Sequence, residues 1–131
     1  MKALRALSLL LCLVALTHQT GCLRSSEKQT VYAIPGPVPS QVTIREKGAA
    51  DIVVIVETRS TLPMASGRGS ALDAKRSKAA AHKALARHLG ATEADTLVVA
   101  GLVELDIVEK NRKLTTTYCV PRSGCRLEKQ N

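Results

Sequence analysis

The stretch Asp51-Ile-Val-Val-Ile-Val-Glu-Thr58 decides the fold, because its centre is an unbroken run of β-branched residues. Such residues favour extended backbone, and a run without polar interruption is typical of a central strand covered on both faces. Just before it, residues 41–45 alternate polar and aliphatic side chains, which predicts a half-buried strand. A turn centred on Gly48 joins the two segments, so we expect a pair of strands at the start of the folded module.

The next regular element is a helix over residues 71–89. Ser70 and Asp73 match the S-x-x-D capping box, in which side chains satisfy free N–H groups at a helix start, and Gly90 supplies a stop. On a helical wheel one side of this segment is mostly alanine, which lets the helix approach a sheet closely. Basic residues line the opposite side, namely Arg76, Lys83 and Arg87.

Two further strands are expected after the helix, over residues 96–108 and 113–120, because both segments are rich in β-branched residues. The polar segment 109–112 between them has the length of a hairpin turn. The order of elements is therefore strand–strand–helix–strand–strand. This order predicts an α+β fold, a small ββαββ module with one helix packed on an antiparallel or mixed sheet.

We expect this α+β domain to occupy residues 41–127 and to be followed by a polar tail over 128–131. Residues 22–40 are expected to form a tether, because 24–30 are polar without periodicity and a short extended piece over 31–34 leads into a proline-rich segment. The proline-rich part is either a loop inside the domain or a semi-rigid extended spacer. Its prolines are Pro35, Pro37 and Pro39.

The start of the chain has the pattern of a secretory signal peptide, which we assign to residues 1–21. Lys2 and Arg5 give it a positively charged start. Residues 6–16 form an apolar run about half as long as the roughly 20 residues that a membrane-spanning helix needs. The alternatives are a buried N-terminal helix and a true membrane anchor.

The residues that follow, Thr20-Gly21-Cys22, resemble the end of the lipobox of bacterial lipoproteins, although Gln19 stands where that class usually has an aliphatic residue. The resemblance implies that Cys22 receives lipid on its sulfur, becomes the mature N-terminus and carries acyl chains such as palmitate. Leu23 follows, where Asp would favour inner-membrane retention, so the resemblance implies a protein of the outer membrane that faces the periplasm. The alternative is ordinary cleavage near residues 15–17, which would leave a free thiol.

The chain contains four cysteines. Cys12 would leave with the leader, and acylation of Cys22 would leave Cys119 and Cys125 as an even pair in an oxidising compartment. The segment between these two contains a proline and a Ser-Gly pair and can fold back on itself, so we expect a structural disulfide. A redox-active or metal-binding pair and two free thiols are the alternatives.

Composition narrows the possible functions. The chain is basic, with a formal net charge of +8, but it contains no Phe or Trp and so no aromatic platform on which single-stranded bases could stack. A leader would also carry the chain out of the cytoplasm, so we expect no nucleic-acid partner. His82 and His88 lie about 120° apart around the helix and do not converge on a metal ion. With no catalytic motif in view, we expect no metal, no cofactor and no enzyme activity.

The leading hypothesis is a small cell-envelope lipoprotein that acts as a non-enzymatic binding or sensing module. It would be held to the membrane by lipid and would present Arg76, Lys83 and Arg87 to an anionic envelope component or a protein partner. The alternative is a structural subunit of an envelope or secretion assembly that docks through an exposed sheet edge. The architecture is also similar to that of small outer-membrane stress-sensor lipoproteins, a likeness that assigns no residues.

Overall fold

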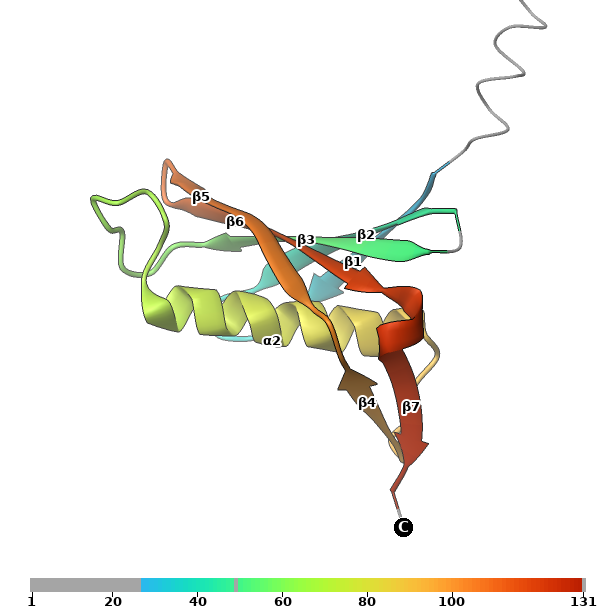
Figure 1. The fold of residues 1–131 in the computed structure, drawn as a ribbon. Helices are drawn as coiled ribbons and strands as arrows, with labels where there is room; N and C mark the ends of the chain where they lie inside the picture. Colours follow the sequence, from blue (N-terminus) through green and yellow to red (C-terminus); the bar gives the residue numbers. More distant parts are fainter. Residues whose placement is uncertain (1–26, 49, 131) are drawn as a thin grey trace, which may run out of the picture.

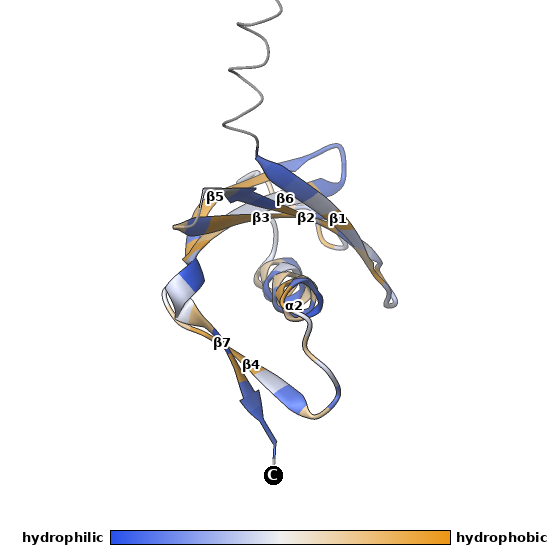
Figure 2. Cartoon of the chain, turned by 90° about the vertical axis from the view of Figure 1, so that its right-hand side faces the viewer, coloured by the Kyte–Doolittle hydropathy of each residue, from blue (hydrophilic) through white to orange (hydrophobic). Residues whose placement is uncertain are grey.

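The computed structural model describes residues 27–48 and 50–130. It has an α+β fold in which one helix packs under a five-stranded antiparallel sheet, while a two-stranded sheet lies against the side of the helix (Figures 1 and 2). The large sheet has the order β1 (Lys28–Ile34), β2 (Ser40–Lys47), β3 (Asp51–Arg59), β6 (Lys113–Pro121) and β5 (Val103–Lys110). The other elements are α2 (Ala71–His88), the short 3-10 helix η1 (Arg122–Gly124), and the paired strands β4 (Asp95–Val99) and β7 (Cys125–Lys129).

Strand β3 is the centre of the large sheet, as its run of β-branched residues predicts, with β2 on one side and β6 on the other. Ile52, Val54 and Val56 are fully buried toward the helix. The expectation that both faces of this strand are covered is wrong, because Val53 and Ile55 on the opposite face are only half-buried. Figure 2 shows the helix on one face of the sheet, with no described element on the other.

Helix α2 packs on the sheet through small residues. Ala81, Ala84 and Leu85 are fully buried, and Ala80 nearly so, which confirms the alanine-rich face expected from the sequence. The expected start is also confirmed, because the Ser70 side chain accepts a hydrogen bond from the backbone N–H of Asp73 at 3.1 Å. Small side chains at this interface let the helix lie close to β2 and β3, so a core without Phe or Trp can still be dense.

The sequence segment expected to be one strand over 96–108 is two strands, β4 and β5, that belong to different sheets. Gly101 lies between them with a φ of 80°, and a Cβ at this position would lie 3.3 Å from the ring of Pro121. Only glycine adopts this backbone conformation easily, so the chain changes direction here. Strand β4 pairs instead with β7, which extends into the segment expected to be a polar tail. The arrangement is therefore α+β with more strands than the expected ββαββ module.

The folded domain begins before residue 41, where the sequence placed its boundary. Strand β1 pairs with β2 along its whole length, from Lys28 opposite Glu46 to Ile34 opposite Ser40. The proline-rich segment is thus a loop between two paired strands, which is one of the two alternatives that the sequence left open. Proline cannot donate to a strand ladder, and here it occupies the connection where no ladder bond is needed.

Candidate functional site

The exposed side of α2 carries a group of cations. Within residues 27–48 and 50–130, four cations of α2 are exposed and take part in no ion pair, as do Lys28, Arg59, Arg68, Lys110, Arg112 and Lys129 outside the helix, whereas Arg45, Arg76, Lys113, Arg122 and Arg126 have acidic partners. The four unpaired cations of the helix, which we call the basic helix face, are Lys75, Lys78, Lys83 and Arg87. Their charge is therefore free to attract an acidic group of another molecule.

The three basic residues expected to form a binding face lie on one flank of α2, the flank toward the loop between β1 and β2. Arg76 and Lys83 line a groove of about 160 Å³ whose other wall is the segment 34–38. Arg87 lies further along the same flank and donates a hydrogen bond from Nη1 to the carbonyl oxygen of Ala33 at 3.1 Å. Helical periodicity thus placed the three residues together, and the proline-rich loop supplies the wall that periodicity does not reveal.

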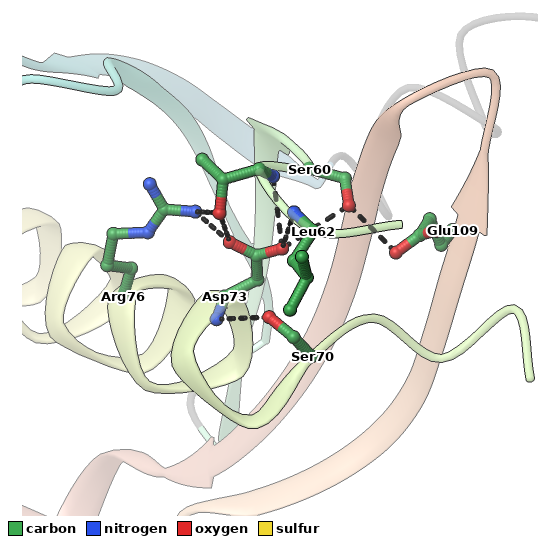
Figure 3. Close-up of polar contacts among 7 residues, drawn as sticks. Ser60, Leu62, Ser70, Asp73, Arg76 and Glu109 are labelled. Atoms are coloured by element: carbon green, nitrogen blue, oxygen red, sulfur yellow. Dashed lines mark hydrogen bonds and ion pairs between the residues drawn. The ribbon is translucent and has the colours of Figure 1, made fainter. Parts of the chain in front are cut away.

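The side chain of Arg76 is less available to a ligand than that of Lys83. Its guanidinium pairs with the carboxylate of Asp73 one turn earlier and also lies 3.3 Å from Thr61 Oγ1 (Figure 3). Because this pair neutralises a buried acid, the net charge that the groove offers to a ligand comes mainly from Lys83. Arg87 remains exposed while its single backbone hydrogen bond holds it beside β1.

Asp73 fixes the loop that precedes the helix (Figure 3). Its fully buried carboxylate accepts hydrogen bonds from Thr61 Oγ1 at 2.6 Å, from the Thr61 N–H at 3.1 Å and from Ser60 Oγ at 3.3 Å. Burial alone would raise the pKa of this carboxyl, but hydrogen bonds from Thr61, the Leu62 N–H and Ser70 lower it to about 2. The group is therefore ionised near neutral pH and accepts hydrogen bonds from the loop.

Glu109 holds the same loop from the other side. It accepts hydrogen bonds from Ser60 Oγ at 2.8 Å and from the Met64 N–H at 3.0 Å, and its own N–H donates to the Gly67 carbonyl at 2.7 Å. Two carboxylates therefore share the Ser60 hydroxyl, and no histidine of the described chain hydrogen-bonds to it. The arrangement can clamp the loop that precedes the helix.

A second polar network lies at the other end of α2. Tyr32 Oη and His88 Nδ1 are 2.8 Å apart, and His88 Nε2 lies 3.2 Å from Glu46 Oε1. Glu46 also pairs with Arg122 of η1. A neutral imidazole protonated on Nε2 fits both contacts, donating to Glu46 and accepting from Tyr32. Sequence reasoning missed this network because its members come from β1, β2, α2 and η1, and no local pattern links them.

The two histidines of the helix do not come together, as their spacing indicates, since His82 is exposed while His88 is occupied by Tyr32 and Glu46. Across the described residues no cluster of three or more His, Cys, Asp or Glu side chains could hold a metal ion. In the same part of the chain, no helix has the length and apolar character needed to cross a bilayer.

The expected disulfide between Cys119 and Cys125 is not formed in the structure, where both are free thiols. Cys119 alternates along β6 with the buried Tyr118 and Val120, so its side chain lies on the sheet face away from the helix. Cys125 starts β7 and packs against the core on the helix side, where burial raises the pKa of its thiol despite the nearby Arg122. The two thiols thus lie on opposite sides of the sheet, which sequence spacing cannot reveal.

Cys22, the expected lipidation site, and the expected signal peptide lie outside the described residues. No known protein family matches this chain, and neither the curated proteins nor the solved structures contain a significant match.

Proposed function

We propose that this protein is a small cell-envelope lipoprotein that acts as a non-enzymatic binding or sensing module through the basic helix face. The observation that carries the proposal is that Lys83 and Arg87 are exposed cations without acidic partners in the described chain, on the flank that borders the proline-rich loop. Unpaired cations clustered on one face attract phosphate-rich or otherwise acidic surfaces. The partner would then be an anionic envelope component or an acidic protein.

The proposed anchor would lie close to the first strand. If Cys22 carries lipid, the segment from there to Lys28 spans roughly 20 Å at most when fully extended. Acyl chains gain about 0.8 kcal/mol for each buried methylene, so several chains would hold the domain firmly at the bilayer surface. The outer membrane, on its periplasmic side, is the proposed location.

The anchor is tested by the intact mass of the mature protein extracted from membranes. A mass that begins at Cys22 and includes a diacylglycerol group is expected. A mass that begins near His18 without modification would overturn the anchor, because it would identify ordinary cleavage and a secreted chain.

The binding face is tested by charge reversal at two residues, Lys83→Glu together with Arg87→Glu. Arg76 is left intact, because its guanidinium compensates the buried Asp73 and its loss would disturb the fold. The probe is soluble polyphosphate, titrated into the detergent-solubilised full chain at low and at high salt. We expect the wild type to bind at low salt and to release the probe at high salt, and the variant to lose most of its affinity.

A matched control reverses two exposed lysines elsewhere, Lys110→Glu with Lys129→Glu. This control changes the net charge by the same amount and leaves α2 intact. Retention of binding in the control with loss in the helix variant supports the assignment of the face. Equal binding by the helix variant and the wild type would refute it.

A structural subunit of an envelope or secretion assembly is the second candidate, and strand β5 favours it. This strand forms an edge of the large sheet, and Val103, Leu105 and Val108 along it are exposed. An open edge can pair with a strand of another protein through backbone hydrogen bonds. Such a complex would be stoichiometric and would survive high salt, unlike a contact made by the basic helix face.

A further inference from the structure

A second pocket lies on the opposite flank of α2, between the helix and strand β5. Its volume is about 420 Å³, within the range of small-ligand sites, and it shares no residue with the groove on the other flank. The residues that line it are Ala74, Lys75, Lys78, Leu102, Glu104 and Tyr118. Four of these carry groups that can bind a polar ligand, and two supply an apolar wall.

Tyr118 gives the pocket a buried hydrogen-bond donor. Its side chain is 4% exposed, and it pairs across the ladder with Glu104 of β5. Burial of the phenol, with a further contribution from the charge of Glu104, raises the pKa of Tyr118 to about 12. The hydroxyl therefore stays neutral and keeps its proton throughout the physiological range.

Lys75 and Lys78 add two positive charges at the same pocket. They lie three residues apart on α2, so both side chains leave the same side of the helix. Neither forms an ion pair within the described chain, and the same holds for the Glu104 carboxylate. The pocket thus combines two ammonium groups and a phenol donor with one carboxylate, none of them neutralised by an ion pair.

This combination favours a ligand that carries charges of both signs over an ion of a single sign. A simple anion would be attracted by Lys75 and Lys78 but repelled by Glu104. A simple cation would be attracted by Glu104 but repelled by the two lysines. A ligand that carries a carboxylate next to an ammonium group satisfies both. The apolar wall of Ala74 and Leu102 can cover a small aliphatic substituent between the two charges.

We propose that this pocket binds a small zwitterion of the α-amino acid type, with its carboxylate held by Lys75, Lys78 and the Tyr118 hydroxyl and its ammonium group held by Glu104. The site goes beyond the function proposed for the basic helix face: it uses Lys75 and Lys78 of that face, but neither Lys83 nor Arg87. Because charge reversal at Lys83 and Arg87 leaves all residues of this pocket in place, the two proposals are tested by separate variants. A free amino acid or the end of a short peptide could supply the same chemistry.

The test is a titration of the detergent-solubilised full chain with alanine, followed by NMR. We expect saturable shifts confined to residues of the pocket, with a dissociation constant in the millimolar range. Acetate carries only the carboxylate and methylammonium carries only the cation, so both should bind at least about tenfold more weakly than alanine. An alanyl dipeptide distinguishes a free amino acid from a peptide end as the source of the group.

Two substitutions remove single contacts from the pocket. Glu104→Gln removes the partner of the ammonium group, and Tyr118→Phe removes the donor while keeping the ring in the core. Each should weaken alanine binding about tenfold, because each removes a charge-assisted hydrogen bond. Asp106→Asn is the matched control, since Asp106 is an exposed acid of the same strand that pairs with Thr117 on the other face of the sheet.

The binding results support or overturn the proposed zwitterion site as follows. Selective binding of alanine that is lost in Glu104→Gln and kept in Asp106→Asn supports it. Absence of saturable shifts, equal binding of acetate and alanine, or an equal effect of the Asp106 control would each overturn it. Thermal unfolding of every variant, followed by circular dichroism, shows whether a loss of binding reflects a loss of the fold.

Discussion

The Tyr32 hydroxyl lies 2.8 Å from His88 Nδ1, and the two rings meet nearly at right angles, at 88°. This contact joins the edge strand β1 to the last turn of α2, and it extends through His88 Nε2 to Glu46 of β2. Strand β1 otherwise depends on its pairing with β2 and on few contacts with the helix. The hydrogen bond therefore links strand β1 to helix α2.

Removing the hydrogen bond between Tyr32 and His88 should lower the stability of the protein by a measurable amount. We expect Tyr32→Phe to reduce the free energy of unfolding by about 1 kcal/mol, because the ring stays and one hydrogen bond is lost. His88→Ala should cost more, since Glu46 also loses a partner. Urea unfolding of both variants and of the double variant gives their coupling energy. Additive effects of the two substitutions would show that the hydrogen bond contributes nothing.

Asp73 should make the protein sensitive to acid. Its pKa lies at about 2 in the folded chain against an ordinary value of 3.8, so its ionised form stabilises the fold above pH 4 by about 2 kcal/mol. Because the folded pKa is the lower one, this contribution is lost as the pH falls from about 4 to about 2. We expect unfolding free energies of the wild type to decline across this window.

Asp73→Asn should remove most of that decline and should already be less stable at neutral pH, because the amide cannot accept the same set of hydrogen bonds. Asp106→Asn, which alters an exposed acid, provides the comparison and should leave the decline in place. A decline between pH 4 and pH 2 that is unchanged in Asp73→Asn would show that other carboxyl groups cause it.

Local sequence signals identified the helix, its cap, the central strand and the turn before β6, where Asn111 and Arg112 adopt φ values of 55° and 62°. Each depends on residues close together in the chain, such as Ser70 and Asp73. Only residues 31–34 of strand β1 were expected to be extended, and they were placed outside the domain because the segment is short and leads into prolines, so its assignment depends on pairing with β2. Strand β4 lies within the segment expected to be a single strand over 96–108, and β7 was missed because its assignment depends on pairing with β4.

The candidate site, like the fold, could be predicted from the sequence only in part. Periodicity alone placed Arg76, Lys83 and Arg87 on one flank of the helix, since residues seven and four apart share a side. The i,i+3 spacing of Asp73 and Arg76 was visible in the sequence, but the contact of Arg87 with Ala33 was not, because Ala33 belongs to an edge strand. The cysteine pair illustrates the opposite error, in which a short spacing suggested a contact that the alternation of β6 prevents.

The two thiols should be accessible without reduction. Mass spectrometry of the protein denatured in the presence of N-ethylmaleimide, with no reductant, should show Cys119 and Cys125 both alkylated. In the folded protein Cys125 should react slowly, because burial raises the pKa of its thiol and leaves less thiolate. Alkylation of neither residue until a reductant is added would show that they form a disulfide.

Unfolding experiments independently test whether Cys119 and Cys125 form a disulfide. A short structural disulfide contributes about 2 kcal/mol, so its removal should be visible in unfolding experiments. We expect the double variant Cys119→Ser with Cys125→Ser to have a transition midpoint that does not depend on reductant. We expect the same of the wild type.

Two glycines with nearly the same backbone conformation differ in what surrounds them. Gly69 has a φ of 75°, and a Cβ at this position would lie 2.8 Å from a methyl carbon of Leu114, which is fully buried. Gly90 has a φ of 76°, and a Cβ there would meet no atom within 4 Å. The pair therefore separates the strain of the backbone from the strain of packing.

Substitution by alanine should measure the two kinds of strain. Gly90→Ala should report the cost of the backbone conformation alone, about 1 kcal/mol. Gly69→Ala should cost clearly more, because Leu114 must also move within a packed core. Urea unfolding of both variants measures the difference, and equal losses would show that the side chain of Leu114 yields without cost.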